Sequence, residues 1–124
     1  MNMVSLRRLL KSFAHAGQGL AYVFKSEQNF RIQVAAGFIV FALALLFPLK
    51  NWEVILVVLL ILIVWLIEIL NTAFEYFSDL FKPRLHHYVH MVKDIMAGAV
   101  LLTSVVALII GVIIFWPHFM NLFR

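Results

Sequence analysis

Four polar residues recur along one hydrophobic stretch of the sequence at a spacing that can support chemistry. They stand three, four and four positions apart and are Glu68, Asn71, Glu75 and Asp79. Residues three or four positions apart lie on the same face of a helix. The spacing therefore predicts one stripe of three carboxyl groups and a carboxamide, which can bind a cation, transfer a proton or orient a polar substrate.

Glu68 is the energetically costly member of this stripe. Fourteen uncharged residues, 54–67, precede it, and Ile69 and Leu70 follow it. A charged residue at bilayer depth costs about 2.5–3.5 kcal/mol on insertion scales, and such residues mark functional sites. Taken alone, Glu68 fits either a functional carboxylate or a protonated group that hydrogen-bonds to a neighbouring helix. The rest of the stripe favours the functional interpretation, because packing does not require three acids on one face.

Three further charged residues are expected at the membrane level of the polar end of the stripe. Lys93 and Asp94 open the last hydrophobic segment and are predicted to face Glu75 and Asp79. Glu27 lies in "SEQNFR", just before the first hydrophobic segment. A surface ion pair contributes little stability, and a single Glu at such a position is more often solvated. Together, however, these residues predict a polar pocket at the inner membrane interface.

A phosphorylated ligand with Mg²⁺ suits this pocket. Proteins usually hold Mg²⁺ with one or two carboxylates together with substrate phosphates. Glu27 and Glu75 can supply those carboxylates. Lys93 can neutralise a phosphate, and Asn71 can orient a reacting group. Glu68 lies about 10 Å deeper than Glu75 at 1.5 Å per residue, where it can meet a lipid hydroxyl.

The composition places this pocket in a membrane protein. Of the 124 residues, 65% are hydrophobic and 13% are charged, and the mean hydropathy is +1.02. Soluble domains carry about 45–50% apolar and about 25% charged residues, so an ordinary soluble domain is excluded. The sequence has no cysteine, which excludes disulfides and thiolate metal sites. Its net charge of +4 is too small to indicate nucleic acid but suits an anionic membrane or a phosphorylated substrate.

The elements that must position the pocket are all helical. Each of three hydrophobic segments is long enough to cross about 30 Å of hydrocarbon. The predicted spans cover about 30–49, 52–77 and 90–116, and the last ends at Pro117. We therefore expect residues 1–124 to form a single all-α integral-membrane domain.

The N-terminal segment, about 4–26, predicts an amphipathic helix. Leucine and phenylalanine side chains share one face, and the opposite face carries Arg7, Arg8, Lys11, His15 and Gln18. Such a helix lies in the membrane interface or packs on the bundle, and the sequence leaves both interpretations open. The segment lacks the continuous apolar core of a cleaved signal peptide, which is therefore not expected.

The distribution of basic residues predicts the orientation in the cytoplasmic membrane. Cytoplasmic segments carry an excess of Lys and Arg. Eight of the ten basic residues lie before or at the start of the first span, or between the second span and the first turn of the third, leaving Lys50 and Arg124 on the opposite side. The N-terminus and the 78–92 loop are thus expected in the cytoplasm, and the C-terminus outside.

Other nucleotide and metal motifs are missing from the sequence. It contains no GxxxxGK[ST] loop, no HRD or DFG kinase signature and no HExxH. His86 and His90 stand four positions apart in the predicted loop, but a zinc site requires further ligands. A zinc site is therefore not predicted.

Two segments resemble the small prokaryotic diacylglycerol kinase and undecaprenol kinase family. They are "EILNTAFEYFSD" (68–79) and "KDIMAGAVLL" (93–102), supported by "KSFAHAGQGL" (11–20), "SEQNFR" (26–31) and "GVIIFWP" (111–117). The resemblance implies a homotrimer with three spans and a surface helix in each subunit. It also implies transfer of the γ-phosphate of ATP to a lipid alcohol with Mg²⁺.

The resemblance assigns roles to the residues of the stripe. Glu68 stands at the position of the catalytic base, which also contacts the lipid, and Asn71 is its polar neighbour. Glu27 and Glu75 stand at the positions of the metal-binding glutamates, where the cofactor Mg²⁺ and the nucleotide meet.

The same resemblance assigns five nucleotide or substrate positions outside the stripe. Lys93 and Asp94 form the nucleotide-contacting pair. Arg8 and His15 fall at N-terminal nucleotide or substrate positions, and His86 at that of a loop histidine near the nucleotide.

Departures from the family pattern bear on the substrate. Many undecaprenol kinases read "HPLAKxAKD" in the cytoplasmic loop, whereas this sequence reads "HHYVHMVKD" and lacks the Pro and one Lys. Diacylglycerol kinases of Gram-negative type usually have Ser at the substrate position of Ala97. Ala97 and His15 thus favour undecaprenol over diacylglycerol. Two other classes remain open from the residues: a transporter or proton channel with Glu68 and Glu75 as a relay, and a membrane scaffold without catalysis.

Overall fold

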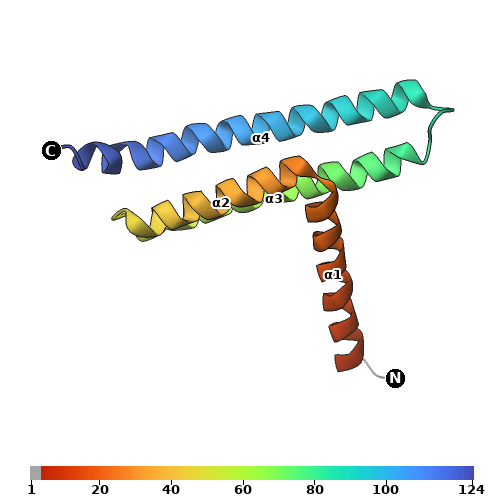
Figure 1. Ribbon diagram of the computed structural model, residues 1–124, viewed down its shortest axis with the longest axis horizontal. Coiled ribbons are helices and arrows are strands. Elements are labelled where there is room, and N and C mark those ends of the chain that lie inside the picture. Colours follow the sequence, from red (N-terminus) through yellow and green to blue (C-terminus); the bar gives the residue numbers. More distant parts are fainter. Residues whose placement is uncertain (1–3) are drawn as a thin grey trace.

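Four α-helices make up the fold in the computed structural model, which describes residues 4–124. They are α1 (Leu6–Ser26), α2 (Gln28–Leu46), α3 (Asn51–Asp79) and α4 (His86–Asn121). Helices α2, α3 and α4 run alongside one another, and α1 leaves them at a steep angle (Figure 1). The predicted all-α membrane fold with an N-terminal amphipathic helix is confirmed, and the homotrimer stays a prediction.

The lengths of the spans set the depth of each polar residue. Helices α2, α3 and α4 are each long and apolar enough to cross a membrane. At 1.5 Å per residue, the 29 residues of α3 extend about 43 Å, well beyond about 30 Å of hydrocarbon. Trp52 and Trp116 are exposed at one end of the bundle, where tryptophan side chains mark a membrane interface. From Trp52, about 20 residues of hydrocarbon depth end near Asn71.

Helix α4 differs from the predicted third span at both ends. It begins at His86, so His86 and His90 lie on its first turns and not in a 78–92 loop, because buried Val89 anchors this segment. The turn between α3 and α4 is confined to residues 80–85. Helix α4 also continues through Pro117 to Asn121, although the proline nitrogen cannot donate a hydrogen bond to the preceding turn.

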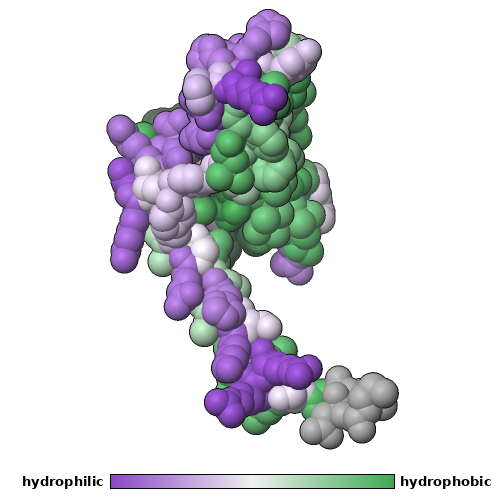
Figure 2. All heavy atoms as spheres, turned by 90° about the vertical axis from the view of Figure 1, so that its right-hand side faces the viewer, coloured by the Kyte–Doolittle hydropathy of each residue, from purple (hydrophilic) through white to green (hydrophobic). Residues whose placement is uncertain are grey.

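Helix α1 contacts the bundle only through its C-terminal part. The leucine and phenylalanine side chains of its apolar face are exposed, among them Leu6, Leu10, Phe13 and Leu20. Figure 2 shows hydrophilic atoms along the visible face of α1, below a bundle whose side is largely hydrophobic. An amphipathic helix with an uncovered apolar face fits the membrane interface better than packing on the bundle.

An elbow at Glu27 joins α1 to α2. The Arg31 Nη1 group donates hydrogen bonds to the carbonyl oxygens of Phe24 and Lys25, at 2.9 and 2.8 Å. Carbonyls in the last turn of a helix have no partner within it, so this guanidinium caps α1. Phe24 and Phe30 pack edge to face with centroids 6.4 Å apart. These contacts fix where α1 ends.

At the opposite end of the bundle, referred to below as the far end, α3 and α4 are joined by polar contacts. Glu53 accepts a hydrogen bond from the backbone N–H of Lys50 at 2.9 Å. His118 Nε2 lies 3.3 Å from the same carboxylate. Beneath this pair, Ala44, Val57 and Ile114 form the buried core of α2, α3 and α4. The three spans are therefore packed together at the far end.

Helices α2 and α3 approach closely at Gly37. A Cβ at this position would lie 2.7 Å from Cζ2 of Trp65, closer than atoms can pack. The Trp65 indole N–H donates to the Gln33 carbonyl oxygen at 2.9 Å, and its ring packs against Phe38. Gly37 thus provides the space that lets Trp65 tie α3 to α2.

Replacing Gly37 by alanine is expected to destabilise the protein because Trp65 must move. Overpacking of this kind typically costs about 1–3 kcal/mol, which exceeds the gain of about 1 kcal/mol that alanine brings to a helix. Thermal unfolding in detergent should show a lower midpoint for Gly37→Ala. Gly111→Ala is the matched control, since a Cβ there meets no atom within 4 Å. Equal midpoints for the two variants would contradict this account of the contact.

Candidate functional site

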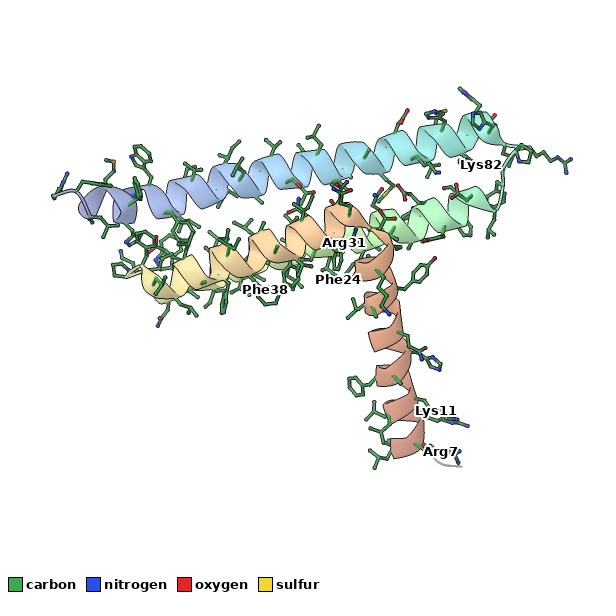
Figure 3. The ribbon with its side chains drawn as sticks, viewed as in Figure 1. Arg7, Lys11, Phe24, Arg31, Phe38 and Lys82 are labelled. Carbon is green, nitrogen blue, oxygen red and sulfur yellow. The ribbon has the colours of Figure 1, made fainter. Side chains whose placement is uncertain are left out.

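Three carboxylates from two parts of the chain meet where the elbow crosses α3. Glu68 is buried in α3 with 3% of its surface exposed, and Glu75 lies two turns further along the same helix. The elbow brings Glu27 to them, and all three carboxylates are close enough to repel one another. Figure 3 shows this crossing, marked by Phe24 and Arg31. We call Glu27, Glu68 and Glu75 the carboxylate cluster.

Electrostatics at the elbow favour a bound cation. Burial raises the pKa of Glu27 above its ordinary value, and the negative charge of Glu75 raises it further, while Arg31 acts in the opposite direction. Both causes disfavour the charged form of Glu27, and a nearby positive charge would relieve them. The arrangement therefore suits a ligand that brings positive charge between Glu27 and Glu75.

Polar groups on α3 surround Glu68. Thr72, which is 2% exposed, donates its hydroxyl hydrogen bond to the Glu68 carbonyl oxygen at 3.0 Å. Asn71 is half-buried and lies on α3 between Glu68 and Glu75. The stripe predicted from the spacing is therefore present on one helix, graded from buried Glu68 to exposed Asp79.

Lys93 faces this stripe from α4, but Asp94 does not. The Nζ atom of Lys93 lies 2.7 Å from Oδ1 of Asp79, and Lys82 lies 3.4 Å from the same oxygen. Asp94 is exposed and lies 3.7 Å from His90 on its own helix. Adjacent helical residues point about 100° apart, so Asp94 turns away when Lys93 turns toward α3. The expectation that both residues face the stripe holds for Lys93 only.

The remaining candidates are exposed, and Arg8, His15 and His86 lie apart from the carboxylate cluster within one chain (Figure 1). Arg8 and His15 are on the projecting part of α1, His86 opens α4, and Ala97 follows Lys93 by one turn. Figure 3 shows the neighbouring residues Arg7 and Lys11 on the side of α1 that faces the same way as the α3–α4 turn. Arg8, His15 and His86 require a ligand or a second chain to join the cluster.

An apolar groove of about 540 Å³ opens between α2, α3 and α4. Trp65 lines it one turn before Glu68, and Leu43 and Phe115 line it toward the far end. Its lining includes Ser104, whose Oγ atom is buried without a hydrogen-bond partner among the described residues. The groove can accommodate a hydrocarbon chain, and on α3 its lining ends at Trp65, one turn before Glu68.

The donor set fits Mg²⁺ only together with a ligand. Among residues 4–124, no three His, Asp or Glu side chains are placed to hold a metal ion by themselves. Glu27 and Glu75 provide two carboxylates, and Mg²⁺ sites of this kind are completed by substrate phosphates and water. Glu27 and Glu75 could therefore hold Mg²⁺ only together with a phosphorylated ligand.

The sequence spacing does not predict that three further residues lie near the cluster. Tyr22 of α1 and Tyr76 of α3 pack with ring centroids 5.3 Å apart, although 54 positions separate them. Arg31 appears in the sequence only as one of several basic residues before the first span. The position of Tyr76 directly after Glu75 is the one available hint.

The sequence is similar to those of known lipid kinases. The sequence matches the family described as prokaryotic diacylglycerol kinase over residues 14–115. It is 38% identical over 112 residues to an undecaprenol kinase of Bacillus subtilis (strain 168). The matched region covers 90% of this chain and 91% of that protein. It is 36% identical over 115 residues to a diacylglycerol kinase of Synechocystis, covering 92% of this chain and 66% of the relative. A diacylglycerol kinase of Escherichia coli (strain K12) is 27% identical over 118 residues, or 95% of this chain and 97% of that protein.

Removing the charge of Glu27 is expected to stabilise the metal-free protein at neutral pH. Because the pKa of Glu27 is raised on folding, the folded state binds this proton more tightly than the unfolded chain. The wild type therefore loses stability as the pH rises through that raised pKa, and Glu27→Gln does not. Thermal unfolding with a chelator should give a higher midpoint for Glu27→Gln near neutral pH and a smaller difference at mildly acidic pH.

Asp94→Asn is the control for this charge effect, since Asp94 is exposed and lies outside the cluster. It should leave the unfolding midpoint unchanged at neutral pH. If the unfolding midpoint of Glu27→Gln is no higher than that of the wild type, the repulsion account is contradicted. An equal increase in the midpoint at both pH values would contradict it as well.

Proposed function

The chain belongs to the prokaryotic diacylglycerol kinase family and is a membrane lipid kinase, and we propose that it transfers the γ-phosphate of ATP to undecaprenol. The carboxylate cluster carries this proposal, because it sets a buried glutamate beside two carboxylates suited to Mg²⁺ with phosphates. Membership of a kinase family supports phosphoryl transfer, rather than transport or a purely structural role, as the function of these acids.

Undecaprenol is preferred to diacylglycerol as the substrate in this proposal. The relative that is 38% identical is an undecaprenol kinase. The family resemblance of the sequence at Ala97 and His15 favours the same branch. The apolar groove beside Trp65 supports a long hydrocarbon chain, since it extends from one turn before Glu68 toward the far end.

Phosphoryl transfer assigns a separate task to each member of the site. The lipid hydroxyl oxygen forms a bond to the γ-phosphorus, the bond from that phosphorus to ADP breaks, and the hydroxyl proton passes to Glu68. An alcohol is far less acidic than a glutamic acid, so this proton moves late, after positioning by Glu68 and Asn71. Most of the catalysis comes from positioning and charge neutralisation.

Charge neutralisation falls to the polar end of the stripe. Glu27 and Glu75 would hold Mg²⁺, which when bound neutralises the phosphate oxygens and orients them. Lys93 adds a positive charge on the side of α4 that faces Asp79. Both the water-soluble nucleotide and the membrane-embedded lipid can reach this level, because α3 crosses the interface near Asn71.

The exposed candidates support a homotrimer in the cytoplasmic membrane. Arg8, His15, His86 and Asp94 would contact the nucleotide, and within one chain they lie apart from the carboxylate cluster. In a trimer a neighbouring subunit can supply such residues, and Ala97 would face the lipid. We place the elbow and the α3–α4 turn in the cytoplasm because basic residues concentrate there, with the C-terminus outside.

The decisive experiment follows label from γ-labelled ATP into lipid. Purified protein with Mg²⁺ and vesicles that contain undecaprenol and diacylglycerol together should label undecaprenol faster. Glu68→Gln should lower kcat by about 100-fold or more, the range lost when a group that transfers a proton is removed, and should leave the apparent affinity for ATP close to wild type.

Glu53→Gln serves as the control for removal of a buried carboxylate, since Glu53 lies at the far end of the bundle. It should retain turnover. Normal activity of Glu68→Gln would refute the role of Glu68, and faster labelling of diacylglycerol would refute the substrate assignment.

A further inference from the structure

A pair of tyrosines connects α1 to α3 beside the carboxylate cluster. The rings of Tyr22 and Tyr76 lie with centroids 5.3 Å apart and planes tilted by 51°. Tyr76 directly follows Glu75, and Tyr22 lies five residues before Glu27. Both rings remain partly open, with 52% and 44% of their surfaces exposed. The contact therefore joins the two segments that supply the outer carboxylates.

The hydrogen bonds of Arg31 and the Phe24–Phe30 contact do not fix α1 relative to α3. Arg31 and the Phe24–Phe30 contact join α1 to α2 alone. Beyond its C-terminal part, α1 projects away from the bundle, so it acts as a long lever on the elbow (Figures 1 and 3). Without a contact to α3, the angle at the elbow would be set by the α1–α2 junction only.

Charge repulsion acts against the geometry that the tyrosine pair maintains. Glu27 and Glu75 carry like charges and repel one another across the gap between the elbow and α3. An increase in the elbow angle would relieve this repulsion and would separate the two carboxylates. Tilted aromatic pairs at this centroid distance attract each other. The Tyr22–Tyr76 contact therefore opposes the opening of the elbow.

We infer that Tyr22 and Tyr76 are positioning residues that hold Glu27 and Glu75 at the separation at which two carboxylates share one divalent cation. The inference rests on the proposed function, in which these glutamates hold Mg²⁺. Neither tyrosine touches the reacting atoms in this scheme. They act by fixing the angle of the elbow, and the quantity that they affect most is the affinity for the cation.

The ring contact and the hydroxyl groups can be separated experimentally. Interaction with the Tyr76 side chain raises the pKa of Tyr22, so an effect of the hydroxyl groups must be distinguished from that of the rings. Tyr22→Phe keeps the ring and removes the hydroxyl, whereas Tyr22→Ala removes both. Because packing of the rings restrains the elbow, phenylalanine should restore most of the wild-type behaviour.

The first test measures lipid phosphorylation as a function of Mg²⁺ concentration at saturating ATP and undecaprenol. Tyr22→Ala and Tyr76→Ala should each raise the half-saturating Mg²⁺ concentration about tenfold, the low end of losses seen when residues that orient metal ligands are removed. The kcat at saturating Mg²⁺ should stay within about twofold of wild type, and Tyr22→Phe should titrate like wild type. Tyr88→Ala is the control, since Tyr88 is an exposed tyrosine of α4.

The second test measures the elbow directly, without activity. The sequence has no cysteine, so spin labels can be attached uniquely at Gln18→Cys in α1 and Phe74→Cys in α3. Pulsed electron resonance without metal should show a broader, longer label distance in Tyr22→Ala than in Tyr22→Phe or wild type. Added Mg²⁺ with a non-hydrolysable ATP analogue should shorten it again.

Three results would overturn the inference: an unchanged Mg²⁺ titration in Tyr22→Ala, a fall in kcat without a shift in that titration, or an unchanged label distance. A Tyr22→Phe variant as impaired as Tyr22→Ala would also overturn it, because the hydroxyl and not the ring would then act. These results differ from failure of the proposed function, in which the wild type itself shows no Mg²⁺-dependent phosphorylation of lipid.

Discussion

Mutual repulsion among carboxylates at a membrane interface is the constraint on which the rest of the structure depends. Glu68 is buried in a span, and Glu27 and Glu75 lie within its electrostatic reach. Like charges repel more strongly in a medium of low polarity than in water, and lipid offers no compensating hydration. Such a cluster persists when rigid helices hold it in place and a ligand supplies the missing positive charge.

Contacts between the helices, made by residues outside the carboxylate cluster, hold the cluster in place. Helix α3 carries two of the carboxylates on one face and continues past the hydrocarbon, so one helix links lipid depth to water. Trp65 locks α3 against α2 at Gly37, and Arg31 caps α1 where the elbow begins. At the far end, His118 and Glu53 join α4 to α3. Together these contacts hold in place the helices that carry the cluster.

Local periodicity explains what the sequence could predict. The stripe and the three spans follow from spacing within single helices, so Glu68 and Glu75 were placed correctly relative to each other. Periodicity within a helix does not predict contacts between distant segments, such as the one between Tyr22 and Tyr76, which stand 54 positions apart. Asp94 was expected beside Lys93, but the rotation between adjacent residues of a helix turns it away from α3. The early start of α4 depends on buried packing that spacing alone does not reveal.

Calorimetric titration of Mg²⁺ into the protein with a non-hydrolysable ATP analogue tests the central claim most directly. The claim is that Glu27 and Glu75 form half of a metal site that phosphates complete. The wild type and Glu53→Gln should bind Mg²⁺ with the same affinity in the presence of the analogue. After subtraction of the heat of Mg²⁺ binding to the analogue alone, the double variant Glu27→Gln/Glu75→Gln should show no saturable Mg²⁺ binding. Wild-type affinity in that double variant would contradict the claim.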